Sequence, residues 1–162
     1  MRKAVILERK ILCQQPGRYI GWPTIAKTAA GELLTVFSGD RDGHICPYGK
    51  TQMIRSQDNG TTWSAPETIN NTPMDDRDAG LCVTQEGTLL VSWFTLFIDP
   101  DAPWLAHYPE ETRKRWKKDV DQITAAERAH WTIPQLTDKA DRGHWLRRST
   151  DNGRTWEAPI QM

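Results

Sequence analysis

One eight-residue pattern occurs twice in this chain of 162 residues and constrains its fold more than any other feature. Residues 56–63 read SQDNGTTW and residues 149–156 read STDNGRTW, so both copies share the skeleton Ser-x-Asp-x-Gly-x-x-Trp. This chemistry suits a β-hairpin turn, because an Asp carboxylate accepts hydrogen bonds from backbone N–H groups and Gly adopts a positive φ without strain. The aromatic ring that follows can pack into the sheet and fix the turn. Four fixed positions that match twice indicate an internal repeat.

Segments with strand-like patterns precede each copy of the repeat in the same order. They lie at residues 23–28, 33–37 and 50–55 before the first copy, and at residues 79–84, 88–94 and 145–149 before the second. Strand, turn, strand, strand, repeated turn and strand together describe one four-stranded unit. The sequence therefore predicts two such units.

The repeated pattern resembles the Asp-box of sialidases (neuraminidases) and related β-propellers. In that family the motif marks the fold and takes no part in the chemistry. The resemblance implies an all-β chain that forms an incomplete six-bladed β-propeller, here about two four-stranded antiparallel blades, with a helical insertion in the second blade. It assigns a structural role to the eight repeated residues, which are Ser56, Asp58, Gly60, Trp63, Ser149, Asp151, Gly153 and Trp156.

The resemblance makes residues 1–162 one partial propeller domain. Blade one covers about residues 18–70 and blade two covers about residues 75–162. The two copies of the pattern lie 93 residues apart, about twice the spacing of one blade. The excess falls at residues 96–143, which we interpret as a helical insertion within blade two.

The insertion has the pattern of a charged helix. Pro109 precedes two acidic residues, which is typical of a helix start. Apolar side chains then recur at helical spacing at Trp116, Val120 and Ile123. We expect a helix from about residue 109 to about residue 129.

The two ends of the sequence suggest strands whose pairing partners lie outside residues 1–162. Residues 3–7, KAVIL, predict a short strand that pairs elsewhere in a complete protein, and Met162 falls inside the outermost strand of blade two. Two blades cannot close a ring and would leave strand edges exposed. We therefore expect the chain to be the N-terminal portion of a larger protein, with the remaining propeller blades missing.

The charge balance restricts the partners of the chain. Lys and Arg together number 21, as do Asp and Glu, so the formal net charge is zero and favours neither nucleic acid nor anionic membranes. No stretch approaches the roughly 18 apolar residues of a membrane helix, and the N-terminus is too charged for a signal peptide. We expect a cytoplasmic protein as the sequence is written, or a secreted or periplasmic one if the true start lies upstream. The eight Trp residues suit a propeller core, with a carbohydrate site as the alternative use of some.

The cysteines predict neither a disulfide framework nor a zinc site. Cys13, Cys46 and Cys82 are odd in number, far apart and without a CxxC pair, so we expect three buried thiols. His44 and Cys46 supply only two potential ligands, which is too few for a metal. We expect no metal and no cofactor.

The run YIGWPTIAKTAAGELLTVFSGDRDGH extends the resemblance to sialidases. Their first blade begins with Tyr-Arg-Ile-Pro, followed by a Gly turn, an apolar strand that ends at a second arginine, and an Asp shortly after it. Pro23 matches the first motif, Arg41 falls where the second arginine lies, and Asp42 falls close to the acid/base aspartate. Gly21 stands where the family has the first arginine. Arg18, three residues earlier, could reach the same volume.

The resemblance also implies a mechanism. Sialic acid carries its carboxylate on the anomeric carbon, so a cluster of guanidiniums holds it, and a Tyr with a neighbouring Glu replaces the usual carboxylate nucleophile. An Asp on a first-blade loop protonates the leaving oxygen or activates water. Asp42 is the first candidate for this acid/base and Asp40 the second, with a plain polar turn over residues 40–43 as the alternative. The other two arginines, the Tyr and the Glu come from later blades in this family.

A second charged cluster, MDDRDAG at residues 74–80, precedes the inner strand of blade two. Its side chains should project toward the central pocket and could bind sugar hydroxyls. Arg77 could pair with Asp42 or with a substrate carboxylate, and salt bridges within the protein are the alternative interpretation. The predicted substrate-binding residues are Arg18, Arg41, His44, Asp76, Arg77 and Asp78.

These observations support one main hypothesis and two alternatives. The first is a sialidase-like glycoside hydrolase of the exo-α-sialidase type, which hydrolyses a terminal glycosidic bond of a carbohydrate substrate and of which this chain holds an incomplete site. The second is a non-catalytic Asp-box propeller that binds carbohydrate or protein, an interpretation that Gly21 favours. The third is that the chain alone has no activity because half of the site is absent.

Overall fold

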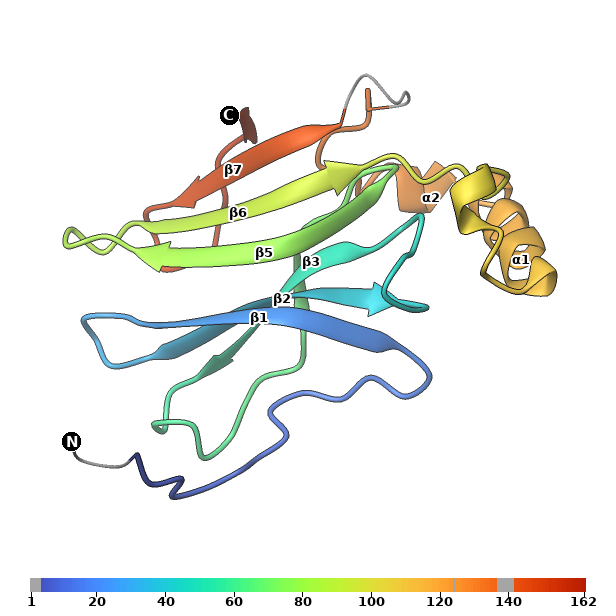
Figure 1. The fold of residues 1–162 in the computed structure, drawn as a ribbon. Coiled ribbons are helices and arrows are strands. Elements are labelled where there is room, and N and C mark those ends of the chain that lie inside the picture. The colour runs from blue at the N-terminus through green and yellow to red at the C-terminus, as the bar shows by residue number, and fades with distance from the viewer. Residues whose placement is uncertain (1–3, 124, 137–141) are drawn as a thin grey trace.

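Two antiparallel sheets of four strands each form most of the computed structural model, which describes residues 4–123, 125–136 and 142–162 (Figure 1). The first sheet contains β1 (Tyr19–Lys27), β2 (Leu33–Arg41), β3 (Lys50–Ser56) and β4 (Glu67–Asn70). The second sheet contains β5 (Asp75–Val83), β6 (Leu89–Leu96), β7 (Gly143–Ser149) and β8 (Ile160–Gln161). Each sheet keeps its strands in chain order. The all-β class and the two four-stranded antiparallel units predicted from the sequence are confirmed.

The two sheets share one apolar core. Alternate residues of a strand lie on the same face, so Leu34 and Val36 of β2 point together, as do Leu89 and Val91 of β6. All four side chains are fully buried, and they meet Met53 of β3 in the same cluster. Strand β5 contacts both β1 and β2. Burial of these apolar side chains therefore holds the two sheets together. The packing also determines which loops of the two sheets lie next to each other.

The first repeated turn, between β3 and β4, is closed by its own polar side chains. The Ser56 hydroxyl donates to Asp58 Oδ1 (2.8 Å) and accepts from the Gly60 N–H (2.9 Å). Asp58 also accepts from the hydroxyl and the N–H of Thr62, at 2.6 and 2.8 Å. The hydrogen bonds from Thr62 and Ser56 favour the ionised carboxylate and lower the pKa of Asp58 to about 2. Trp63 is half-buried and donates Nε1–H to the Gly60 carbonyl (3.1 Å).

The second repeated turn, between β7 and β8, repeats the hydrogen bonds among the Ser, Asp, Gly and Thr of the first. The Ser149 hydroxyl donates to Asp151 (2.7 Å) and accepts from the Gly153 N–H (2.8 Å). The hydroxyl and the N–H of Thr155 donate to Asp151 at 2.5 and 2.9 Å and lower the pKa of that carboxyl. Gly153 has a φ of 78°, a conformation that Gly adopts without strain. Trp156 is half-buried against the core that the two sheets share.

The connection between β6 and β7 carries the helices. It contains η1 (Pro103–Leu105), α1 (Glu110–Asp121) and α2 (Ala125–Arg128) (Figure 1). The expectation of a single helix to about residue 129 is therefore wrong. Gln122 caps α1 with its N–H on the Lys118 carbonyl, and α2 buries no side chain, so no apolar stripe continues the first helix. Of the described helices, none is long and apolar enough to cross a bilayer.

The start of α1 and its buried face agree with the sequence pattern. Pro109 is the N-cap, and two glutamates occupy the first turn. Trp116 is fully buried and packs with Ile98 and Leu105 from the segment before the helix. Tyr48, which follows β2 in the first sheet, lies against the same cluster. The helical connection of the second sheet therefore packs onto a loop of the first.

The first described residues form no strand, in contrast to the strand predicted over residues 3–7. Val5, Ile6 and Leu7 are exposed and belong to no strand. A strand needs a hydrogen-bonding neighbour, and among the described strands none pairs with this segment. Residue 3 itself lies outside the described residues.

Cysteine and tryptophan side chains are less buried than the sequence analysis expected. Cys46 is buried, whereas Cys13 is partly buried and Cys82 is exposed, so the prediction of three buried thiols is wrong for two of them. Cys82 lies on β5 between two half-buried residues, on the face of the strand that the core does not cover. Three tryptophans are buried, namely Trp93, Trp116 and Trp145.

Candidate functional site

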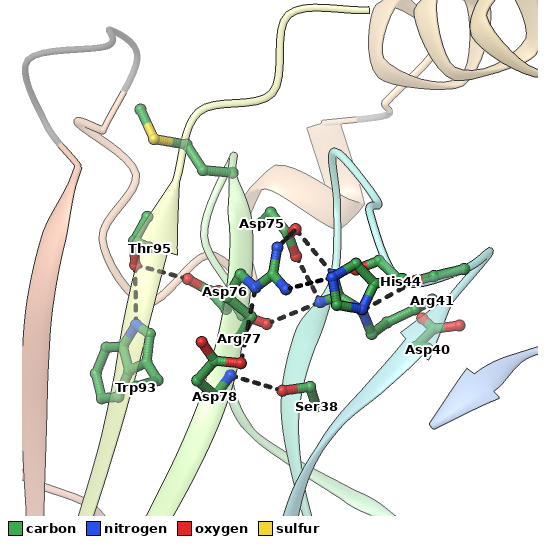
Figure 2. Close-up of polar contacts among 12 residues, drawn as sticks. Ser38, Asp40, Arg41, His44, Asp75, Asp76, Arg77, Asp78, Trp93 and Thr95 are labelled. Atoms are coloured by element: carbon green, nitrogen blue, oxygen red, sulfur yellow. Dashed lines mark hydrogen bonds and ion pairs between the residues drawn. The ribbon is translucent and has the colours of Figure 1, made fainter. Parts of the chain in front are cut away.

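Two charged segments meet at one end of the two sheets. Strand β2 ends at Arg41 and continues into the loop of residues 42–49, and β5 begins at Asp75. In Figure 1 the end of β2, the start of β5 and the helices all lie on the same side of the molecule. The Asp76 N–H donates to the Gly49 carbonyl (3.0 Å), which joins the loop to the start of β5. Figure 2 shows the side chains that these segments bring together.

Arg41 and Asp75 form a buried bidentate ion pair across the two sheets. Both side chains are fully buried, and Nη1 and Nη2 of Arg41 lie 2.5 and 2.8 Å from the two Asp75 carboxylate oxygens. The remaining Arg41 donors reach the carbonyls of Gly43, His44 and Asp76, at 3.4, 3.0 and 3.2 Å. Burial raises the pKa of Asp75, and the Arg41 guanidinium opposes that shift. Arg41 therefore shapes the loop that carries His44, and every one of its donors is already engaged.

Asp42 faces helix α1. Its carboxylate accepts from Arg18 (2.5 Å), the Tyr48 hydroxyl (2.6 Å), Arg115 (2.9 Å) and the Trp116 indole (3.0 Å). Burial alone would raise the pKa of Asp42, but the Tyr48 hydrogen bond and the two positive charges together hold it below its ordinary value. Asp42 is thus an ionised carboxylate that links the first sheet to the helical connection of the second.

Asp40 forms a separate, half-buried cluster with two cations. Its carboxylate lies 2.9 Å from Arg18 Nε and 2.5 Å from Lys50 Nζ. Arg18 also donates to the Asp40 carbonyl, so it bridges Asp40 and Asp42. Asp40 has a φ of 52°, a left-handed backbone conformation that costs a non-Gly residue energy. The structure thus places Arg18 with the two candidate acids.

Asp76 is fully buried beneath the site. Its carboxylate accepts from the N–H and hydroxyl of Thr72, at 2.7 and 2.9 Å, and from the Thr95 hydroxyl at 2.9 Å. The Trp93 indole in turn donates to the Thr95 hydroxyl (3.0 Å; Figure 2). Burial raises the pKa of Asp76 to about 7. Asp76 has no exposed surface with which to contact a ligand directly.

Arg77, His44 and Asp78 lie together at the surface of the site. Arg77 Nη2 is 3.5 Å from His44 Nε2, and Arg77 Nε is 3.8 Å from Asp78 Oδ1. The Asp78 N–H donates to the Ser38 hydroxyl (2.9 Å), which fixes the start of β5 against β2 (Figure 2). The side chains of His44 and Asp78 are exposed. The charged neighbours of Arg77 are Asp75 and Asp78, so the structure agrees with the alternative interpretation of salt bridges within the protein.

Trp22 is a member of this group that the sequence analysis did not single out. Its ring lies 5.0 Å from the His44 ring, and the guanidiniums of Arg77 and Arg41 lie 5.1 and 5.6 Å from its centroid. Trp22 and Asp78 both have positive φ, 52° and 56°, and each sits at an irregular register of the first strand of its sheet. The sequence feature that could have identified Trp22 was its position immediately before Pro23 in the matched motif.

The Tyr19 ring lies close to the position at which a side chain on residue 21 would begin, where the resemblance expects an arginine. A Cβ at this position would lie 3.1 Å from the Tyr19 ring, which covers the backbone of β1. Tyr19 in turn contacts Trp22, with ring centroids 5.9 Å apart. Aromatic side chains therefore occupy the start of β1 where the resemblance predicts a cation.

Two cavities border the charged groups. The larger has a volume of about 1030 Å³ and extends from Arg18 and Asp40 past Tyr48 to Trp131 and Trp156. The smaller, of about 350 Å³, lies beside Asp78 and is lined by β6, β7 and Met162. Among the described residues, no three His, Cys, Asp or Glu side chains gather as metal ligands would.

Comparison with known proteins places the fold. No family model and no curated protein matches the chain. A solved structure of a protein of unknown function from Dyadobacter fermentans DSM 18053 is similar at 20% identity and a TM-score of 0.62, over 93% of this chain and 38% of that one. The Hadza microbial sialidase Hz136 is similar at 18% identity and a TM-score of 0.55, over 88% of this chain and 25% of that one. This chain shares its fold with these structures and spans well under half of the length of each.

Proposed function

We propose that this chain contributes two blades, at about residues 18–70 and 75–162, to the six-bladed β-propeller of a sialidase-like glycoside hydrolase of the exo-α-sialidase type. One observation carries the proposal. The charged loop after β2 and the charged start of β5 meet at one end of two four-stranded sheets, in a fold that is similar to that of a sialidase. Active sites of open β architectures gather where loops of several units converge, so this end is where a glycoside would bind.

The proposal gives the predicted residues different roles. His44, Arg77 and Asp78 are exposed or border the exposed groups and would contact the sugar. Asp42 and Asp40 would transfer protons. With its pKa held low, Asp42 suits the activation of a water molecule, since an ionised carboxylate accepts a proton. To protonate a leaving oxygen, Asp42 would first have to lose some of its hydrogen-bond donors.

The buried residues Arg41 and Asp76 would position other residues of the site and would not contact the sugar. Arg41 would position the loop that carries His44, because its donors hold the carbonyls of that loop. Asp76 would support the backbone at the start of β5 through Thr72 and Thr95. The repeated turns would keep the structural role that the resemblance implies, since their polar side chains bond within each turn.

A non-catalytic propeller that binds carbohydrate or protein is the second candidate. Two observations favour it. The start of β1 has Gly21 and the Tyr19 ring where the resemblance expects a cation. The Asp42 carboxylate accepts from four donors and faces helix α1 instead of a pocket. A propeller that only binds would need neither group for chemistry.

A hydrolysis assay on the full-length protein separates the two candidates. We expect cleavage of fluorogenic α-sialosides and no cleavage of matched neutral glycosides. Asp42→Asn keeps the shape of the side chain and removes the titrating group, and it should lower turnover about a hundredfold. Asp101→Asn, an exposed acid paired with Lys117 on the helical connection, is the control and should retain turnover. Binding of a sialoside without hydrolysis would favour the binding propeller, and full activity of the Asp42→Asn protein would refute a proton-transfer role for Asp42.

A further inference from the structure

The larger cavity is separate from the residues proposed to contact the terminal sugar. Its volume of about 1030 Å³ is at the upper end of the range of small-ligand pockets. Its walls come from the first sheet, from the helical connection and from the outer part of the second sheet. None of its described lining residues is His44, Arg77 or Asp78. A molecule in this cavity would therefore bind through a different set of side chains.

Hydrogen bonds hold the helical connection against the first sheet at this cavity. The Thr132 N–H donates to the Asn71 carbonyl (2.7 Å), and the Asn71 N–H donates to the Thr132 hydroxyl (3.1 Å). Ile133, the next residue, belongs to a buried cluster with Trp93 of the second sheet. The segment around Trp131 is thus fixed to both sheets, so the cavity is formed before a ligand arrives, which lowers the cost of binding.

Arg147 of β7 joins the two sheets at the same cavity. Its guanidinium donates to the carbonyls of Ile69 (2.5 Å), Glu157 (2.9 Å) and Trp156 (3.2 Å). A guanidinium has five N–H groups, and the three bonds to these carbonyls leave two. Within the described ranges of the chain, no carboxylate pairs with Arg147, and burial lowers the pKa of Arg147. The cavity therefore has donors that suit an oxygen acceptor.

Two partly exposed tryptophans from different elements line the cavity. Trp131 follows α2, and the guanidinium carbon of Arg128 lies over its ring, 5.2 Å from the centroid. Trp156 belongs to the second repeated turn and packs against the core that the two sheets share. Each ring is thus supported by the protein and also has surface in the cavity. The nonpolar face of a sugar ring packs on such a surface, while its hydroxyls form hydrogen bonds at the edge.

The Lys, Arg, Asp and Glu side chains of the cavity balance in charge. Three basic and three acidic residues of these types are among its described lining residues, namely Arg18, Lys50, Arg147, Asp40, Asp119 and Glu127. Arg18 and Lys50 pair with Asp40, at 2.9 and 2.5 Å. Balanced charge provides no net field to attract an ion, whereas the polar groups can still bond hydroxyls. The expected ligand is therefore uncharged, polar and able to pack against aromatic rings.

We propose that the larger cavity binds a neutral oligosaccharide, whose sugar rings pack on Trp131 and Trp156 and whose hydroxyls accept from Arg147. The amide side chains of Asn71 and Gln122 also line the cavity and would bond further hydroxyls. This inference goes beyond the proposed function, because it needs no hydrolysis and uses none of the residues proposed to contact the terminal sugar. The helical connection, which supplies Trp131, would then serve to build a second carbohydrate site beside the two sheets.

Titration of the full-length protein with neutral oligosaccharides tests the inference. The probes are maltotetraose, cellotetraose and lacto-N-neotetraose, which differ in their linkages, and calorimetry measures their binding. We expect at least one of the three to bind. Trp131→Ala should weaken that binding about fivefold or more, because it removes one aromatic surface. Trp131→Phe keeps a smaller ring and should fall between the parent and the alanine variant.

Trp104→Ala is the matched control. Trp104 is an exposed tryptophan of the same helical connection that does not line the larger cavity, so its loss should leave the affinity unchanged. A second measurement needs no variant: the bound probe should slow oxidation of Trp131 by N-bromosuccinimide, located by peptide mass spectrometry, and leave oxidation of Trp104 unchanged.

Three results would overturn the inference. They are that none of the three probes binds, that the affinity survives in a folded Trp131→Ala protein, or that a bound probe leaves the oxidation of Trp131 unchanged. The hydrolase proposal is tested separately, by cleavage of α-sialosides. Binding that depends on Trp131 without cleavage of any glycoside would leave this site standing and the hydrolase proposal refuted, and cleavage without binding of the probes would give the reverse.

Discussion

Neighbouring residues at the start of β5 differ in how their charge is balanced. Asp75 has a bidentate guanidinium against it, whereas Asp76 has only hydroxyl and N–H donors from Thr72 and Thr95. Hydroxyl donors compensate a buried charge less than a cation does, so burial dominates at Asp76 and raises its pKa to about 7. Protonation of Asp76 should therefore couple folding to pH near neutrality.

The stability of the protein should fall between about pH 4 and pH 7 through Asp76. An unfolded Asp titrates near pH 4, so in this window the folded state binds a proton that the unfolded state has released. The contribution is fully favourable below the window and is lost as the pH rises through about 7. Asp76→Asn carries no titrating group and should flatten this part of the pH dependence, by on the order of a few kcal/mol across the window. Urea unfolding of both proteins at intervals from pH 4 to pH 8 measures the difference, and parallel curves would contradict the assignment.

The two repeated turns share one motif but differ in how closely the core packs against them. Both turns have the same Ser–Asp–Gly hydrogen bonds, but they face different surroundings. A Cβ on Gly60 would meet its nearest atom, in Leu33, at 3.6 Å, whereas a Cβ on Gly153 would lie 3.1 Å from Met53 and 3.2 Å from Leu89. The second turn is thus pressed against the core that joins the sheets, and the first is not.

Gly153→Ala should therefore destabilise the protein more than a comparable change in an open turn. It places a side chain at a φ of 78° and crowds the core, with an expected loss of about 2–4 kcal/mol. Gly87→Ala, in the turn between β5 and β6, is the matched control, because its φ is 84° and no atom lies within 4 Å of the new Cβ. That change should cost about 1–2 kcal/mol from the backbone alone. Equal losses in urea unfolding would show that the core does not press on the second turn.

At the scale of the whole molecule, α1 connects to one sheet and packs onto the other. Trp116 joins the two through its buried ring and through its indole N–H on Asp42. Trp116→Ala should cost about 3–5 kcal/mol. Trp104→Ala, on the neighbouring η1 and 52% exposed, should stay within about 0.5 kcal/mol of the parent. Circular dichroism and tryptophan fluorescence should report one shared urea transition, and an early helical transition in the Trp116→Ala protein would instead show that α1 unfolds separately.

Local sequence signals predicted the strands and the turns, because those elements depend on alternation and on turn chemistry within a few residues. Strand positions followed from apolar runs such as residues 33–37, which lie within β2. The break after α1 escaped prediction because helical spacing continues to Ile123 while the packing that would extend the helix does not. The partners of Asp42 escaped it too, since Arg115 and Trp116 follow more than 70 residues later. Asp42, the first acid/base candidate from the sequence, is thus held by the helical connection of the other sheet.

The contacts of Asp42 also bear on the order in which the molecule folds. Each sheet keeps its strands in chain order, so most strand pairs join nearby residues and can form early, whereas β6 and β7 pair across the helical connection. The hydrogen bonds of Asp42 to Arg115 and Trp116 instead span 73 and 74 residues, and they need α1 to lie against the loop after β2. We therefore expect docking of the helix to be a late step of folding. On that expectation, the loop after β2 acquires its final shape after the hairpins of the first sheet, when α1 packs against it.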